Sequence, residues 1–152
     1  MVLLVMVSSF NLGTTRTVGS AASYTPQSDG RTAKDGVFTE VQSERGAEIY
    51  RRSCRKCHYA DLLGDGSDGT PGEVAPPLAG PGFAVRWHGE TIGELFRAIK
   101  RAMPQDRPGT LEADAVVDLI SYLLKMNDFP TGNSELPATE ETLDLMMVEV
   151  TP

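Results

Sequence analysis

The two cysteines of the chain are three positions apart, and a histidine directly follows the second: Cys54, Cys57 and His58. A disulfide between these cysteines would close a loop too short to constrain much of the unfolded chain. A thioredoxin-like dithiol requires a βαβ setting, which the hydrophobic pattern does not indicate. A zinc site normally needs four protein ligands, and the other histidine, His88, is far along the chain. A zinc or dithiol protein stays open as a minor alternative.

The spacing Cys-x-x-Cys-His is also the attachment motif of c-type haem. Two thiols add to the two vinyl groups of one porphyrin edge, and the next residue is then held where its imidazole can reach the iron. A six-coordinate haem needs a second axial ligand, and a thioether in that position favours ferrous iron. Met103 suits this role because it follows a predicted helix and precedes Pro104 on an irregular loop. The alternative for Met103 is an ordinary core methionine.

Composition limits the class of protein. The 152 residues suit one domain with tails, and the hydrophobic fraction of 40% with a charged fraction of 23% is ordinary for a soluble globular chain. The net charge of −7 opposes binding to nucleic acid. An acidic surface of this kind suits a protein partner with a basic docking patch.

The N-terminus reads "MVLLVMVSSF", followed by a polar stretch rich in small residues. We expect residues 1–22 to be a secretory signal peptide cleaved after small residues, and therefore a periplasmic location. The apolar run is too short to cross a bilayer, so no stable membrane insertion is expected. Residues 23–37 are expected to be a flexible linker, residues 38–130 the globular domain, and residues 131–152 an extension that packs on the domain.

Three helices are predicted in the globular region, which gives an all-α fold. The first spans residues 44–53 with Ser43 as N-cap. The second begins after Thr91, whose spacing to Glu94 is that of a capping box, and ends by Arg101 or Ala102, ahead of Pro104. The third spans residues 111–126 with Thr110 as N-cap.

Irregular segments connect and follow these helices. The stretch dense in glycine and proline between the first two helices, residues 64–83, is expected to be an ordered loop. In the C-terminal extension, every second position from 143 to 147 carries a large apolar side chain: Leu143, Leu145 and Met147. This alternation predicts a tail that packs back on the body in extended form.

Four motifs together resemble a class I cytochrome c: "GAEIYRRSCRKCH", "APPLAGPGF", "AMP" and "ISYLLKMNDFP". The resemblance covers residues 38–130 and implies the cytochrome c fold, a small helical domain wrapped around one covalently bound haem c. It implies that Cys54 and Cys57 attach the haem, with His58 as proximal and Met103 as distal iron ligand.

The same resemblance assigns supporting roles. The Pro76 carbonyl would accept a hydrogen bond from the second ring nitrogen of His58, and Leu78 would pack against the haem. Gly46 and Tyr50 would cross the last helix near Tyr122. The Trp87 indole would either donate to a haem propionate or cap the core.

A narrower resemblance concerns the stretch from Leu78 to Leu111, the "NDFPTG" turn and the "ELP" tail, which are similar to cytochrome modules associated with quinoprotein dehydrogenases. It implies an electron carrier, not itself an enzyme, that accepts electrons from a periplasmic quinoprotein dehydrogenase, as a shuttle or as a subunit of that complex. An oxidase or another cytochrome of the respiratory chain would be the acceptor. The alternative function is a five-coordinate haem protein that senses small ligands or acts as a weak peroxidase.

Other polar residues are expected to be solvated. His88 is predicted to lie on the surface, and Arg86 and Arg107 to be solvated arginines that could instead neutralise propionates. The acidic residues after the cysteine motif do not have the spacing of an EF-hand calcium loop, so a solvated loop is expected. These residues are Asp61, Asp65, Asp68 and Glu73.

Overall fold

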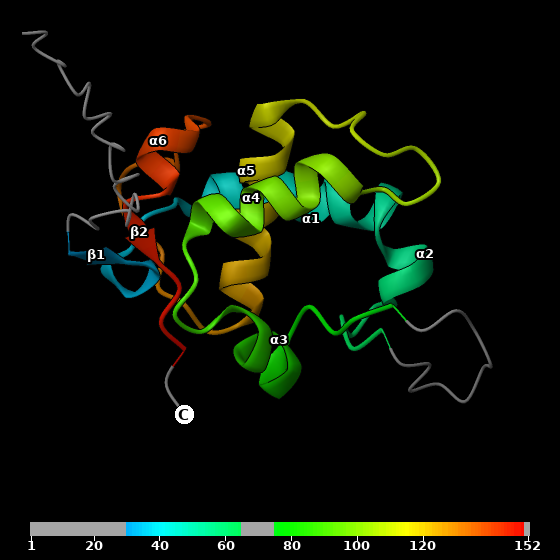
Figure 1. Cartoon of the computed structure of the whole chain (residues 1–152), viewed down its shortest axis with the longest axis horizontal. Helices are drawn as coiled ribbons and strands as arrows, with labels where there is room; N and C mark the ends of the chain where they lie inside the picture. The colour runs from blue at the N-terminus through cyan, green and yellow to red at the C-terminus, as the bar shows by residue number, and fades with distance from the viewer. Residues whose placement is uncertain (1–29, 65–74, 151–152) are drawn as a thin grey trace, which may run out of the picture.

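The computed structural model describes residues 30–64 and 75–150 (Figure 1). The predicted signal peptide, residues 1–22, lies outside the described residues, as do Asp65, Asp68 and Glu73 of the acidic loop. Helices dominate the described chain, which confirms the all-α prediction. They are α1 (Glu40–Ser53), α2 (Arg55–His58), α3 (Gly80–Trp87), α4 (Ile92–Ala102), α5 (Ala113–Met126) and α6 (Glu140–Leu143), with a 3-10 turn, η1 (Ala33–Asp35), and two short strands, β1 (Arg31–Thr32) and β2 (Met146–Met147).

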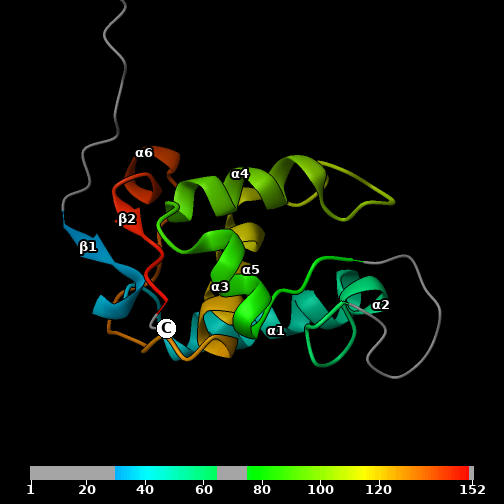
Figure 2. The ribbon, with the colours of Figure 1, turned by 60° about the horizontal axis from the view of Figure 1, so that its bottom comes forward.

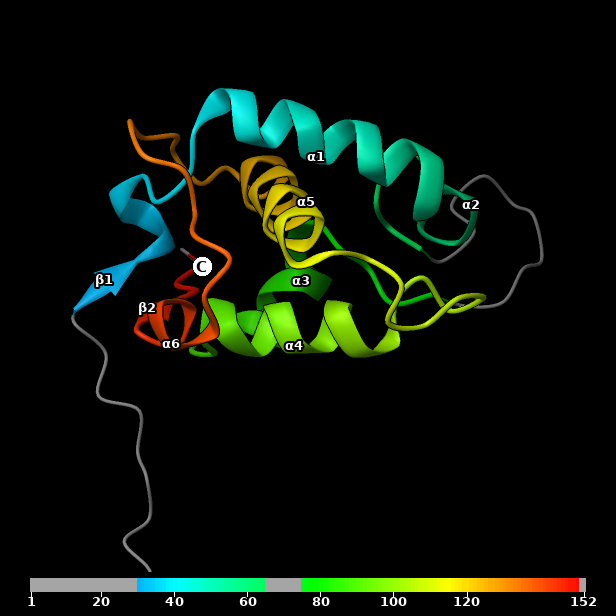
Figure 3. The same cartoon turned by 90° about the horizontal axis from the view of Figure 1, so that it is seen from above.

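Helix α5 lies between α1 and α4 (Figure 3). The crossing of α1 and α5 depends on Gly46, because a Cβ atom there would lie 1.9 Å from the carbonyl oxygen of Asp118. One turn later, the rings of Tyr50 and Tyr122 contact each other with centroids 5.3 Å apart and planes tilted by 46°. The expected crossing of the first and last large helices at Gly46, Tyr50 and Tyr122 is therefore present.

The predicted start of α1 was wrong by one turn. The helix begins at Glu40, and the N-cap is Thr39, whose side chain accepts a hydrogen bond from the Gln42 amide. Ser43, the predicted N-cap, is buried and donates its hydroxyl to the carbonyl of Glu40 instead. The sequence contains two cap residues four positions apart, and the long-range bonds of Gln42 to Leu136 favour the earlier one.

Of the other two predicted helices, one has the expected bounds and the other begins later than expected. Helix α4 begins after Thr91, whose side chain accepts from the Glu94 amide, and ends at Ala102 as predicted. Helix α5 begins at Ala113, not Leu111, with Glu112 at the N-cap position. Thr110, the predicted cap, donates its hydroxyl to the carbonyl of Arg107 and so belongs to the preceding turn.

Helix α3 was not predicted, since its sequence lies in a segment assigned to a loop. Its proline occupies the first turn, where the missing N–H costs no helical hydrogen bond. The helix is anchored by Phe83 and Trp87, which are both buried in the core. The density of glycine and proline predicted a loop for this segment. The segment is helical instead, and the burial of the two aromatic side chains stabilises it.

The segment before α1 also differs from expectation where it is described. Residues 30–37 were expected to be linker, yet β1 pairs in parallel with β2, and Ala33 and Val37 are buried. Two segments of the chain also come into close contact at Gly36 and Gly132, where a Cβ atom on Gly132 would lie 1.8 Å from the Gly36 carbonyl oxygen. A composition of small residues does not reveal this structure, because the pairing partner lies at the other end of the chain.

The C-terminal extension packs on the body, although not in the predicted register. Its buried side chains are Leu136, Leu143, Met146 and Val148, whereas Leu145 and Met147 are half-buried. The reason is that Leu143 belongs to the short helix α6 and the strand begins only at Met146. Figure 2 shows α6, β2 and β1 gathered at the end of the molecule opposite α2. In the part of the chain that the structure describes, no helix is both long and apolar enough to span a membrane.

Candidate functional site

Helix α1 leads into the single turn α2, which carries the cysteine motif. The Cys54 amide donates to the Tyr50 carbonyl at 2.9 Å, and the His58 amide donates to the Cys54 carbonyl at 3.0 Å. Positions i, i+3 and i+4 share one face of a helix. Cys54, Cys57 and His58 therefore lie along one face of the turn, with Cys54 half-buried, Cys57 exposed and His58 buried.

Both cysteines are free, so the disulfide interpretation does not apply to the described structure. Burial raises the pKa of the Cys54 thiol to about 11, with a further contribution from Cys57. A raised pKa disfavours the thiolate, which is the form of a cysteine that attacks disulfides. No cluster of three or more His, Cys, Asp or Glu side chains among residues 30–64 and 75–150 is arranged to hold a metal ion. The raised pKa of the Cys54 thiol weakens the dithiol alternative.

The imidazole of His58 is oriented by a bond to the opposite segment. Its Nδ1 atom lies 2.9 Å from the carbonyl oxygen of Pro76. Because a carbonyl can only accept, Nδ1 must carry the proton, which leaves the lone pair on Nε2. Burial lowers the pKa of His58, and the bond to Pro76 opposes this effect only in part. The side chain is thus a neutral imidazole whose Nε2 is available as a metal ligand.

The segment that presents Pro76 is itself held by several backbone bonds. The Leu78 amide donates to the Leu62 carbonyl at 2.7 Å, and the Ala75 amide donates to the Gly64 carbonyl at 3.1 Å. Gly64 has φ +67°, and a Cβ atom there would lie 2.3 Å from the Ala75 carbonyl oxygen. A side chain at position 64 would therefore separate the two backbone segments, around Gly64 and Ala75, whose contact brings Pro76 to His58.

Asn127, at the C-terminal end of α5, was not singled out by sequence reasoning. Its Nδ2 atom donates to the carbonyls of Leu78 at 3.0 Å and Leu123 at 2.8 Å, and its Oδ1 atom accepts from the Gly80 amide at 2.9 Å. Asn127 therefore ties the segment carrying Pro76 and Leu78 to α5. The motif "KMND" after a helix suggests only a C-cap, so its long-range contacts could not be read from the sequence.

Met103 ends α4 on an extended backbone, and its amide donates to the Ile99 carbonyl at 2.9 Å. Its side chain is half-buried and packs against the hydrophobic core, as do Cys54 and Leu78. Three of the residues predicted for the site thus border the same core, although one directly follows α1, one lies in the 75–79 segment and one directly follows α4. The next residue, Pro104, is buried.

Of the remaining candidate residues, Trp87 is buried, whereas His88 and Arg107 are exposed. Trp87 is buried in the core at the end of α3, with the Arg86 guanidinium 4.2 Å from its ring centroid. His88 is exposed, as predicted, and Arg107 is exposed beside Asp106. Asp61 accepts a hydrogen bond from the Leu63 amide, so it supports the local turn.

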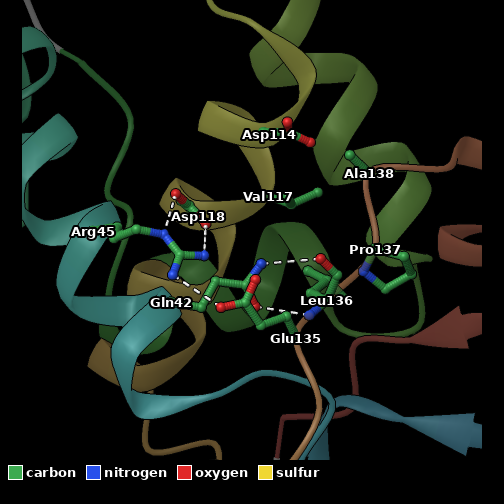
Figure 4. A pocket seen from close by; sticks show the side chains of 9 residues that line it. All are labelled: Gln42, Arg45, Asp114, Val117, Asp118, Glu135, Leu136, Pro137 and Ala138. Atoms are coloured by element: carbon green, nitrogen blue, oxygen red, sulfur yellow. Dashed lines mark hydrogen bonds and ion pairs between the residues drawn. The ribbon is translucent and has the colours of Figure 1, made fainter.

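A polar pocket of about 440 Å³ lies between α1, α5 and the C-terminal extension (Figure 4). Arg45 makes two bonds of 2.9 Å to the Asp118 carboxylate and one of 2.9 Å to Glu135. Gln42 accepts from the Leu136 amide at 2.7 Å and donates to its carbonyl at 3.0 Å. These hydrogen bonds and ion pairs connect the C-terminal extension to α1, and they connect α1 to α5.

The donor set of the site has a specific chemistry. It combines a neutral imidazole with a free Nε2, a thioether on a loop, and two free thiols within one helical turn. Nitrogen and thioether ligands suit iron in a haem, and the two thiols suit covalent attachment of its vinyl groups. The residues present therefore fit a c-type haem better than zinc.

Comparison with known proteins gives the same result. The sequence model of the family described as "Cytochrome C oxidase, cbb3-type, subunit III" matches residues 41–123, more than half of the chain. The match spans α1, the cysteine motif, α4 and most of α5. No curated protein and no solved structure matches the chain.

Proposed function

Because the chain belongs to this c-type cytochrome family and is a class I monohaem cytochrome, we propose that it carries single electrons on a haem c bound through Cys54 and Cys57, with His58 and Met103 as axial ligands. The observation that carries the assignment is the 2.9 Å bond between His58 Nδ1 and the Pro76 carbonyl. It leaves Nε2 unprotonated and fixes the plane of the imidazole, as a metal-binding histidine requires.

When bound, the haem supplies an iron that alternates between the ferric and ferrous states. The two axial residues of this chain would occupy both open positions and so keep oxygen and peroxide from the metal. The thioether of Met103 would raise the reduction potential, because soft sulfur favours ferrous iron. The half-buried positions of Cys54, Leu78 and Met103 at the core would limit the access of water. These roles describe a carrier and not an enzyme.

The redox partners and the location are part of this proposal. The resemblance to cytochrome modules of quinoprotein dehydrogenases supports such an enzyme as the electron donor. The description of the matched family, a subunit of a cytochrome c oxidase, supports an oxidase of the respiratory chain as the acceptor. The apolar N-terminus, which is typical of a secretory signal, supports export to the periplasm.

The mass of the mature protein tests the attachment. After denaturation, the protein should retain the mass of one haem and lack residues 1–22. The double variant Cys54→Ala/Cys57→Ala should retain no haem, whereas His88→Ala, which changes an exposed residue, should retain it. Loss of the haem from the unchanged protein on denaturation would overturn the covalent assignment.

Reduction kinetics test the partner. A purified quinoprotein dehydrogenase with its substrate should reduce the holoprotein in stopped-flow measurements, and a terminal oxidase should reoxidise it. The rates should depend on ionic strength, because complementary charges speed the encounter of redox proteins. Reduction by a different dehydrogenase alone would replace the proposed donor while leaving the carrier function intact.

A further inference from the structure

The hydroxyl of Tyr50 reaches the backbone beside the proposed iron ligand. It lies 3.1 Å from the carbonyl oxygen of His58 and 2.7 Å from that of Tyr59. Tyr50 is buried in the core, on the last turns of α1. A phenol has one proton to donate, so the shorter contact to Tyr59 is the stronger and the two carbonyls share one donor.

The backbone at this point adopts a costly conformation. Tyr59, which ends α2, has φ 59° and ψ 179°, a region that is essentially restricted to glycine. A residue other than glycine stays in this region only when surrounding contacts hold it. Its amide donates to the Arg55 carbonyl at 2.9 Å, and its carbonyl accepts from Tyr50. The hydrogen bond from the Tyr50 hydroxyl therefore helps to hold this reversal of the chain.

The histidine is thus held at two points. Pro76 holds the ring through Nδ1, and Tyr50 holds the backbone that carries the ring. The direction of Nε2 depends on both, because rotation of the backbone at His58 moves the ring even when the bond to Pro76 persists. Tyr50 also contacts Tyr122, so the position of the ligand is set from the crossing of α1 and α5.

We propose that Tyr50 is a positioning residue for the proximal ligand, acting through the His58–Tyr59 backbone by means of its hydroxyl group. The inference rests on the proposed role of His58 as an axial ligand. It assigns to the hydroxyl a function that an aromatic ring alone, packing between two helices, would not have.

The matched pair Tyr50→Phe and Tyr122→Phe separates the two roles. Each substitution removes one hydroxyl from the same pair of contacting rings and keeps both aromatic rings. The readouts are the iron–histidine stretching band in the ferrous Met103→Ala background, where His58 would be the one remaining axial residue, and amide hydrogen exchange of His58 and Tyr59 in the holoprotein.

Tyr50→Phe should shift or broaden the iron–histidine band and accelerate exchange of the two amides roughly fivefold, the effect of losing one buried hydrogen bond. Tyr122→Phe should leave both readouts unchanged. Equal effects of the two variants, or none from Tyr50→Phe, would show that Tyr50 acts by ring packing alone. If the band is absent even with Tyr50 intact, the assignment of His58 fails instead, so the two failures are distinguishable.

A rescue variant covers loss of the holoprotein. Glycine adopts the backbone conformation of residue 59 without support, so Tyr59→Gly should restore the band of Tyr50→Phe towards that of the parent. If Tyr50→Phe yields no holoprotein, recovery of holoprotein in Tyr50→Phe/Tyr59→Gly supports the proposal. Failure of the double variant to recover it would contradict a role through the backbone.

Discussion

The Nδ1 atom of His58 lies 2.9 Å from the carbonyl oxygen of Pro76, although the two residues are 18 positions apart. This contact joins the turn that carries both thiols to the segment that follows Gly64 and Ala75. It settles the tautomer of the imidazole without any other side chain, because a carbonyl can only accept. The most specific feature of the site is therefore a backbone contact, and its dependence on neighbouring residues can be tested.

Removal of the Asn127 amide should loosen the segment that presents Pro76. Asn127→Ala removes bonds to Leu78 and Gly80 and should lower the free energy of unfolding by about 2 kcal/mol, since each lost hydrogen bond contributes about 1 kcal/mol. Denaturant unfolding of the holoprotein measures the loss. The exposed Asn133→Ala is the control and should change stability by less than about 0.5 kcal/mol. Equal effects of the two variants would contradict the role of Asn127.

A Cβ atom at position 46 should separate α1 from α5. Gly46→Ala places a methyl group 1.9 Å from the Asp118 carbonyl oxygen and 2.8 Å from Tyr122 Cβ, and neither neighbour is a flexible side-chain end. We expect destabilisation of about 3 kcal/mol or failure to accumulate holoprotein. Thermal unfolding gives the shift, and Val41→Ala, at an exposed site on the same helix, should be close to neutral. A stable Gly46→Ala protein would mean that the helices cross elsewhere.

The C-terminal extension should contribute stability through a buried amide. Gln42→Ala removes both bonds to the Leu136 backbone and leaves a buried donor and acceptor unpaired, at a cost of about 3 kcal/mol. The exposed Gln105→Ala is the control. Equilibrium unfolding measures both variants, while the optical spectrum should stay unchanged because the site is remote from Gln42. A cost below about 0.5 kcal/mol would show that the extension is not fastened there.

Acid should destabilise the protein through His58. Burial lowers the pKa of this histidine in the folded chain, whereas the unfolded chain binds a proton near pH 6.5. The unfolded state therefore binds more protons as the pH falls below about 6.5, and stability should decrease by up to about 1.4 kcal/mol per pH unit. Unfolding of the holoprotein between about pH 6.5 and 5.5 measures the slope, and the proposed bond of His58 to iron acts in the same direction because a ligating imidazole binds no proton.

The exposed histidine provides the control for this pH dependence. His88→Gln should leave the slope unchanged, since it replaces a side chain that lies at the surface. Stability that stays flat over the same pH interval, or a slope that disappears in His88→Gln, would contradict the buried neutral state of His58.

The candidate site residues could be chosen largely from local sequence. The spacing of Cys54 and Cys57, the following His58 and the methionine before Pro104 are all features of neighbouring residues. Helix α4 was predictable for the same reason, since Thr91 caps it and Pro104 follows it. The contact of Pro76 with His58 came from the family resemblance, and the structure contains it. Local patterns were sufficient wherever the relevant partner lay within a few positions.

The rest depended on contacts between distant residues. The start of α1 at Thr39 and not Ser43 is favoured by the bonds of Gln42 to Leu136, which is 94 positions away. The pairing of β1 with β2 joins the two ends of the described chain, so the segment before α1 resembled a linker in composition alone. The role of the Tyr50 hydroxyl could not be read either, because the backbone conformation of Tyr59 has no sequence signature.

The absorption spectrum of the ferric holoprotein, followed by carbon monoxide addition to the reduced form, tests the central claim most directly. The parent should show the far-red band of methionine–iron ligation and bind carbon monoxide slowly. Met103→Ala should lose the band and bind carbon monoxide rapidly, whereas Met126→Ala, an exposed methionine at the end of α5, should match the parent. A parent without the band that binds carbon monoxide rapidly would contradict the carrier function and favour a five-coordinate ligand sensor.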